Sequence, residues 1–103
     1  MKTAFAIVVA LALAPVAAPA APVDDAMNKA GCMACHTKDK KLVGPSFNEV
    51  AAKYKGQDVV AKLMDKVRKG GSGVYGPVPM APNPPDKIND ADLKAAVELI
   101  LKS

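Results

Sequence analysis

The sequence has little of what usually holds a small protein together. Its 103 residues include no Trp, and there are only two Phe, two Tyr and two Cys. Cys32 and Cys35 are three positions apart, so a disulfide between them would close too short a loop to stabilise a domain appreciably. We therefore expect one small domain in which a metal or cofactor supplements the core.

Long apolar runs are also missing. The run from Ala4 to Ala14 is broken at Pro15, whereas a membrane-spanning helix needs roughly 20 apolar residues. Residues 1–20 contain one Lys and no acidic residue, and they end in small residues up to Ala20, a pattern typical of a secretory signal peptide. We predict a signal peptide over residues 1–20 that is cleaved after Ala20, a mature domain over residues 21–103, a periplasmic location and no stable membrane insertion.

The charge of the mature chain is nearly balanced. Removal of residues 1–20 takes away one of 14 basic residues and none of the 10 acidic ones, so the net charge falls from +4 to +3. Lysines alternate with acidic residues along most of the chain. Nucleic-acid-binding proteins instead cluster basic residues beside aromatic platforms, so the sequence predicts no nucleic-acid partner.

Apolar residues recur at helical spacing, and no alternating strand pattern is present. The sequence therefore predicts an all-α domain with four helices. The expected N-caps are Asp24 or Asp25, Ser46, Asp58 and Asn89, and the expected ends are Ala30, the region near Gly56, the glycine run at 70–73, and Leu101. Residues 37–46 are expected to form a loop, as are residues 76–85, which carry five of the nine prolines.

The motif that carries chemistry is Cys-Met-Ala-Cys-His at residues 32–36. In a near-helical turn both sulfurs and the imidazole can address one flat object, and this spacing is the signature of covalent c-type haem attachment. A thioredoxin-like pair would need a βαβ context, and a structural zinc site would need four ligands. A buried disulfide beside an incidental His stays open as the alternative.

The iron ligands can be narrowed by counting. His36 is the only histidine, so the second axial ligand must be Met, Lys, water or nothing. Met33 lies within the attachment motif, and Met27 and Met64 lie on helices where a core role is favoured. Met80 lies in the proline-rich loop, 44 residues after His36, and can reach the opposite face of a haem.

Several segments together resemble small class I bacterial cytochromes c of the c-551 type. They are the Cys-x-x-Cys-His motif, Val-Gly-Pro at 43–45, Ala-Ala-Lys-Tyr at 51–54 and the sequence ending in Gly-Pro-Val-Pro-Met at 76–80. This resemblance covers the mature chain. It implies a fold of four to five short helices wrapped around one covalently attached haem c.

The resemblance also implies roles for single residues. Cys32 and Cys35 would carry the thioether bonds, and His36 and Met80 would be the axial iron ligands. The Pro45 carbonyl would accept a hydrogen bond from the ring of His36, and Asn83 would donate to the sulfur of Met80. Tyr75 and Lys66 would lie near a haem propionate.

A haem iron with both axial positions filled has no place for substrate, so we expect a one-electron carrier and not an enzyme. The alternative is a haem protein whose sixth position is open or labile and binds small ligands or peroxide. Expected partners are a reductase or oxidase and a membrane cytochrome donor, docking on a monomer at the exposed haem edge. The cations that could surround this edge are Lys38, Lys40, Lys41, Lys66, Arg68 and Lys69.

Overall fold

The computed structural model describes residues 6, 7, 9, 10 and 23–103. Its elements are the α-helices α1 (Val23–Ala30), α2 (Phe47–Lys53), α3 (Val60–Lys69) and α4 (Asp90–Leu101) and the 3₁₀ helix η1 (Cys32–Ala34). The only β pairings among these residues are two isolated bridges, so the prediction of an all-α domain is confirmed. The predicted signal peptide falls largely outside the described residues.

Side-chain caps fix the start of two helices. The hydroxyl oxygen of Ser46 accepts a hydrogen bond from the backbone N–H of Glu49 at 3.1 Å, and the side chain of Asn89 accepts from Asp92 at 2.8 Å. Both bonds satisfy donors that a helix leaves free in its first turn. The predicted caps of α2 and α4 are confirmed.

The other two predicted caps are wrong. α1 begins at Val23, so Asp24 and Asp25 lie inside its first turn, where their charges still complement the helix dipole. α3 begins at Val60 after Val59, and no side chain caps it. Val59 is buried, so its burial fixes the entry to α3 in place of a hydrogen bond from Asp58.

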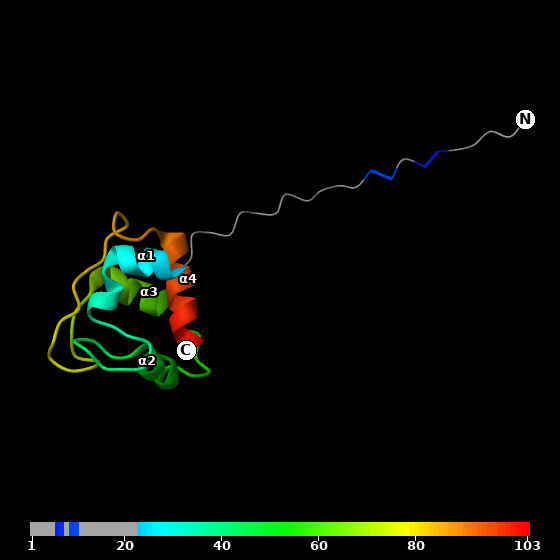
Figure 1. Cartoon of the computed structure of the whole chain (residues 1–103). Coiled ribbons are helices and arrows are strands. Elements are labelled where there is room, and N and C mark those ends of the chain that lie inside the picture. The colour runs from blue at the N-terminus through cyan, green and yellow to red at the C-terminus, as the bar shows by residue number, and fades with distance from the viewer. Residues whose placement is uncertain (1–5, 8, 11–22) are drawn as a thin grey trace, which may run out of the picture.

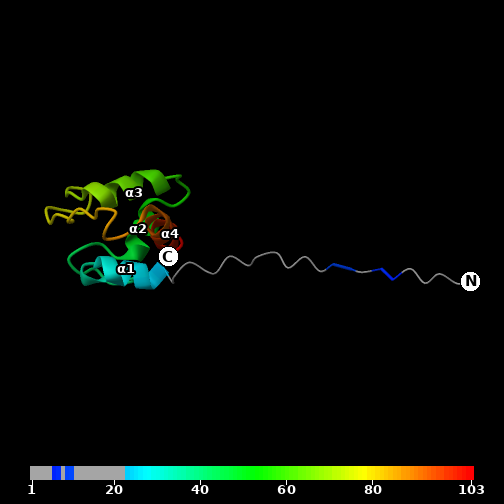
Figure 2. The ribbon, with the colours of Figure 1, turned by 90° about the horizontal axis from the view of Figure 1, so that it is seen from above.

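α4 is the central helix, because it contacts α1, α2 and α3 (Figures 1 and 2). The core forms where α1 and α4 meet, and Met27 and Val97 are its most deeply buried side chains. Burial of such apolar surface is the main source of stability. The other buried members of this cluster are Ala26, Phe47, Ile88, Leu93 and Ala96.

Two long irregular segments leave this helical core on one side. They connect η1 to α2 and α3 to α4, and Figure 1 shows them passing along the same side of the molecule. Proline density accounts for the second segment, since each proline removes a backbone donor. Among the described residues, no helix is long and apolar enough to cross a membrane.

We expect Met27→Ala to lower the free energy of unfolding by about 2–5 kcal/mol, because the shortened side chain leaves a cavity between α1 and α4. Leu99→Ala is the control, since Leu99 lies on α4 with 43% of its surface exposed. Denaturant titration of the purified protein measures both. Equal losses for the two variants would contradict this view of the core.

Candidate functional site

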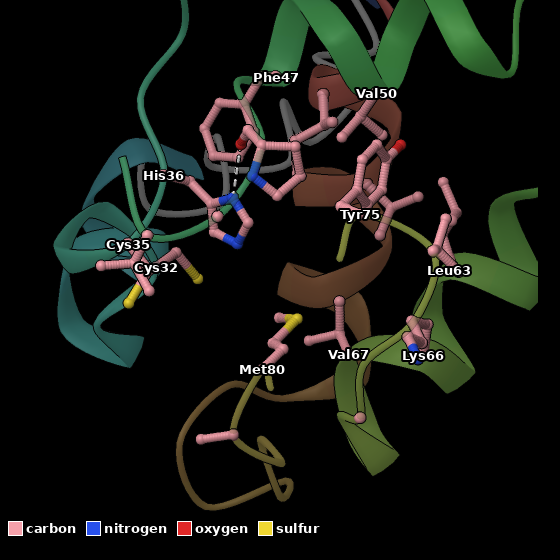
Figure 3. A pocket seen from close by; sticks show the side chains of 18 of the residues that line it. Cys32, Cys35, His36, Phe47, Val50, Leu63, Lys66, Val67, Tyr75 and Met80 are labelled. Carbon is pink, nitrogen blue, oxygen red and sulfur yellow. Dashed lines mark hydrogen bonds between the residues drawn. The ribbon is translucent and has the colours of Figure 1, made fainter. Parts of the chain in front are cut away.

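An apolar cavity of about 310 Å³ lies between the helical core and the two long segments (Figure 3). Its walls come from helices α1, α2, α3 and α4, from the Cys-x-x-Cys-His segment, and from residues 43–45 and 71–81. Most of the lining side chains are apolar. Such a cavity suits a large apolar ligand that is oriented by a few polar groups.

The two cysteines lie at one side of this cavity. Gly31 has a left-handed backbone (φ 84°), which turns the chain from α1 into η1. The carbonyl of Cys32 then accepts hydrogen bonds from the N–H groups of Cys35 (3.2 Å) and His36 (3.0 Å). Both thiols are free, and burial raises the pKa of the Cys32 thiol. The turn therefore presents two thiols and an imidazole to one cavity.

The ring of His36 is held by its neighbours. Its Nδ1 lies 2.8 Å from the carbonyl oxygen of Pro45, and because a carbonyl only accepts, Nδ1 carries the proton. The ring of Phe47 stacks on the imidazole, with 5.5 Å between centroids and 23° between planes. The structure thus contains the hydrogen bond to Pro45 that was expected. The other ring nitrogen, Nε2, faces the cavity (Figure 3), where a metal-ligating nitrogen would have to lie.

Gly44 lets the backbone approach this ring. A Cβ built on Gly44 would lie 2.5 Å from Cε1 and 2.8 Å from Nδ1 of His36, distances that side-chain atoms cannot adopt. The N–H of Gly44 also donates to the carbonyl of Cys35 at 2.8 Å. Because residue 44 has no side chain, the imidazole of His36 can lie directly against the backbone at this position.

Met80 lies across the cavity from His36, and Figure 3 shows the two side chains pointing toward one another. Its backbone forms an antiparallel bridge with Gly71, with N–H to O distances of 2.9 and 3.0 Å. Gly70 makes this bridge possible, because a Cβ there would lie 2.3 Å from the carbonyl oxygen of Met80. The two glycines thus fix the strand-like segment that carries the sulfur.

Asn83 does not make the expected contact. Its side-chain amide donates to the carbonyls of Ala81 (3.0 Å) and Val67 (3.4 Å), so both amide protons are used and none points to the sulfur of Met80. Asn83 is buried, and its backbone N–H also donates to Val67 at 3.0 Å. The expectation is therefore corrected: Asn83 attaches the segment after Met80 to α3.

Tyr75 and Lys66 both line the cavity. The hydroxyl of Tyr75 is buried without a hydrogen-bond partner. Burial raises the pKa of this phenol to about 12, and the nearby Tyr54 and Glu49 raise it as well. A buried donor without a partner is costly, so this hydroxyl is a position where a polar group of a ligand would fit.

The six cations expected near the cavity differ in their surroundings. Arg68 has a side chain only 18% exposed and forms an ion pair with Asp90, while Lys69 pairs with Asp65 at 3.1 Å. Arg68 is therefore not a free docking charge, because it is engaged inside the fold. Lys38, Lys40 and Lys41 are exposed and, within the described part of the chain, form no ion pair.

Sequence reasoning missed two features of the site. Stacking of Phe47 on His36 brings together residues eleven positions apart, and Phe47 could equally have been a core residue only. The bridge between Gly71 and Met80 could have been suspected from the paired glycines at residues 70–71, which indicate a close backbone approach.

The donor set fits a haem. In residues 23–103 and the few described before them, no three His, Cys, Asp or Glu side chains come together to hold a metal ion. One imidazole and one thioether face each other instead, and these can supply two axial ligands to an iron that a macrocycle already coordinates. Two thiols at the cavity edge and an apolar lining complete what covalent attachment requires.

Comparison with known proteins agrees with this chemistry. Residues 20–103 match the family model described as Cytochrome c. The chain is 51% identical over 76 residues to cytochrome c2 of Rubrivivax gelatinosus, covering 73% of this chain and 89% of the relative. It is 41% identical over 102 residues to cytochrome c-552 of Nitrosomonas europaea, covering 98% and 97%.

A solved structure is similar over most of the fold. The crystal structure of wild-type Nitrosomonas europaea cytochrome c552 matches with a TM-score of 0.69 at 41% identity, covering 77% of this chain and 96% of that one. Its likeness extends from the sequence to the arrangement of the helices.

We expect Gly44→Ala to displace the imidazole of His36 and to destabilise the protein by about 1–3 kcal/mol, as overpacking in a tight site does. Gly56→Ala is the control, because Gly56 has φ 76° but nothing within 4 Å of an added Cβ. That variant measures backbone strain alone, at about 1–2 kcal/mol. NMR of the His36 ring and denaturant titration test both variants, and an unmoved ring in Gly44→Ala would contradict the steric argument.

Proposed function

This chain belongs to the cytochrome c family, and we propose that it is a periplasmic one-electron carrier whose haem iron is bound axially by His36 and Met80. Family membership and the Cys-x-x-Cys motif imply one covalent haem c. The observation that carries the finer proposal is the pair of opposed donors, since Nε2 of His36 and the sulfur of Met80 face each other across one apolar cavity (Figure 3).

The roles of the other site residues follow from their positions. Cys32 and Cys35 attach the haem through thioether bonds, and Pro45 holds the His36 ring by its 2.8 Å hydrogen bond. Such a bond to the non-ligating nitrogen fixes the ring's orientation and increases its basicity. The hydroxyl of Tyr75 and the amine of Lys66 are the donors available to the propionate carboxylates.

When bound, haem supplies an iron that gains and releases one electron. The chain's own residues keep that exchange free of side reactions. Met80 fills the position that oxygen or peroxide would need, and a thioether ligand favours the reduced state. Hydrogen bonds at Gly71 and Pro45 hold both ligand-bearing segments in place, so little rearrangement would be needed between oxidation states.

Export and a cleaved leader belong to the same proposal. The match to the cytochrome c family begins at residue 20, next to the predicted cleavage after Ala20. This supports a mature domain over residues 21–103. A haem attached outside the cytoplasm would be used by periplasmic redox partners, with the protein acting as a monomer.

Redox proteins are the partners of this family, and we place their docking at the cavity mouth. Two of the residues that line the cavity, Val43 (56% exposed) and Val78 (58%), are exposed apolar side chains, and Leu42 (48%) precedes Val43 in the chain. Lys40 and Lys41 lie beside Leu42 in the chain and are exposed. An apolar patch with cations at its rim suits brief contact with an acidic surface on a reductase, an oxidase or a membrane cytochrome.

We expect Met80→Ala to abolish the long-wavelength sulfur-to-iron charge-transfer band of the ferric protein and to let the ferrous protein bind carbon monoxide. Met64→Ala is the matched control, since Met64 packs against the core from α3. The Met64→Ala variant should keep the charge-transfer band, and its ferrous form should not bind carbon monoxide. A band that survives in Met80→Ala, or carbon monoxide binding by the unaltered protein, would favour the open-site alternative.

Electron exchange with an acidic redox partner should slow as salt is added, because steering charges are screened over about 8 Å at physiological ionic strength. Replacing Lys40 and Lys41 with Gln should slow the low-salt rate and flatten its salt dependence. The control replaces Lys94 and Lys102, which are exposed on and just after α4. Rates that stay flat between low and high salt would reject docking at the Lys40–Lys41 rim.

A further inference from the structure

The segment after Met80 closes the C-terminal end of α3. Gly70 donates to the carbonyl of Lys66 at 2.7 Å, which is the last backbone bond of the helix. In a longer helix the carbonyl of Val67 would accept from Gly71, but Gly71 donates to Met80 instead. The backbone and side-chain N–H groups of Asn83 take that free carbonyl at 3.0 and 3.4 Å. The end of α3 and the Met80 segment therefore satisfy each other's polar groups.

Arg68 extends this attachment from the neighbouring position on α3. Its Nη1 donates to the carbonyl of Asn83 at 3.1 Å and to that of Ile88 at 2.7 Å. Its Nη2 donates to the carboxylate of Asp90, the first residue of α4. One guanidinium thus joins both ends of residues 83–90 to α3.

We infer that Arg68 is a positioning residue for Met80: it keeps the thioether in place by fastening the segment that follows it. This inference rests on the proposed ligation by Met80. Met80 is fixed upstream by its bridge to Gly71, whereas downstream the chain is irregular and rich in proline. Without Arg68, the hydrogen bonds that tie this segment to α3 within the described residues would be those from Asn83 to Val67.

Burial shows which of the three contacts matter. The Asp90 side chain is 84% exposed, and ion pairs with an exposed partner contribute little. Asn83 is 8% exposed and Ile88 4%, so their carbonyls have little access to water. The loss of a charged donor to two such acceptors is the costly part of removing Arg68. The carbonyl bonds, not the ion pair, therefore fasten the segment.

Lysine cannot replace this arginine. The guanidinium is planar and carries donors on separate nitrogens, so it reaches three acceptors from one position. The ammonium of lysine is a single compact charge at the end of a flexible chain and cannot reproduce this geometry. Arg68→Lys therefore keeps the charge near Asp90 and most of the stem packing, while it removes the geometry that serves both carbonyls. The two kinds of contact can be separated by mutation.

The test uses the haem-loaded protein in five forms: unaltered, Arg68→Met, Arg68→Lys, Asp90→Asn and Lys69→Met. The last is the matched control, since Lys69 is the next residue on α3 and its pair with Asp65 lies on the surface. One readout is the affinity of the ferric protein for added imidazole, which competes with the sulfur of Met80. The other is hydrogen exchange at the backbone amides of Met80 and Asn83, compared with that of Val97 in the core.

Both Arg68 variants should bind imidazole about tenfold more tightly than the unaltered protein, the effect of losing roughly one charge-assisted hydrogen bond. Exchange at Met80 and Asn83 should accelerate relative to Val97, because the opening is local. The imidazole affinities of Asp90→Asn and Lys69→Met should stay within about twofold of that of the unaltered protein, because exposed ion pairs contribute little.

Imidazole affinity in both Arg68 variants equal to that of Lys69→Met would overturn the inference. So would exchange that accelerates equally at Val97, since this would mark a general loss of stability. If Arg68→Met does not fold, Arg68→Lys decides alone. Unaltered protein that binds imidazole as tightly as Met80→Ala would instead overturn the ligation by Met80, and the positioning of that ligand with it.

Discussion

The structure depends on an apolar cavity that separates the imidazole of His36 from the thioether of Met80 (Figure 3). The core has few large side chains, and its walls are also the walls of this cavity. Met27 and Val97 are buried in the core and also line the cavity. The helices therefore pack around the cavity as well as against one another. A bound macrocycle would complete the interior that a chain without Trp cannot fill by itself.

The two sides of the cavity are held in different ways. His36 is fixed locally, since Pro45 and Phe47 lie within eleven residues of it and Gly44 lets the backbone approach. Met80 is fixed by the bridge to Gly71, and the segment after it is tied to α3 over a longer distance along the chain, by the bonds from Asn83 to Val67. Local contacts cost little chain entropy to form, while longer connections cost more. The methionine side is therefore the more easily loosened.

Much of this arrangement follows from short-range patterns in the sequence. The caps Ser46 and Asn89 and the stop at Gly31 each depend on a few neighbouring residues, and each was predicted correctly. The start of α3 was not, because burial of Val59 determines it. Asn83 and Arg68 were misassigned for a related reason. Apart from the bond from Asn83 to Ala81, their partners lie 15 to 22 residues away, and no local pattern specifies a contact across that distance.

The central claim is that one nitrogen and one sulfur from this chain both bind the iron. X-ray absorption at the iron edge of the purified ferric protein measures the ligand set directly. The account predicts one sulfur at bonding distance and five nitrogens, four from the macrocycle and one from His36. A first shell of nitrogen or oxygen alone, or of five ligands, would contradict it.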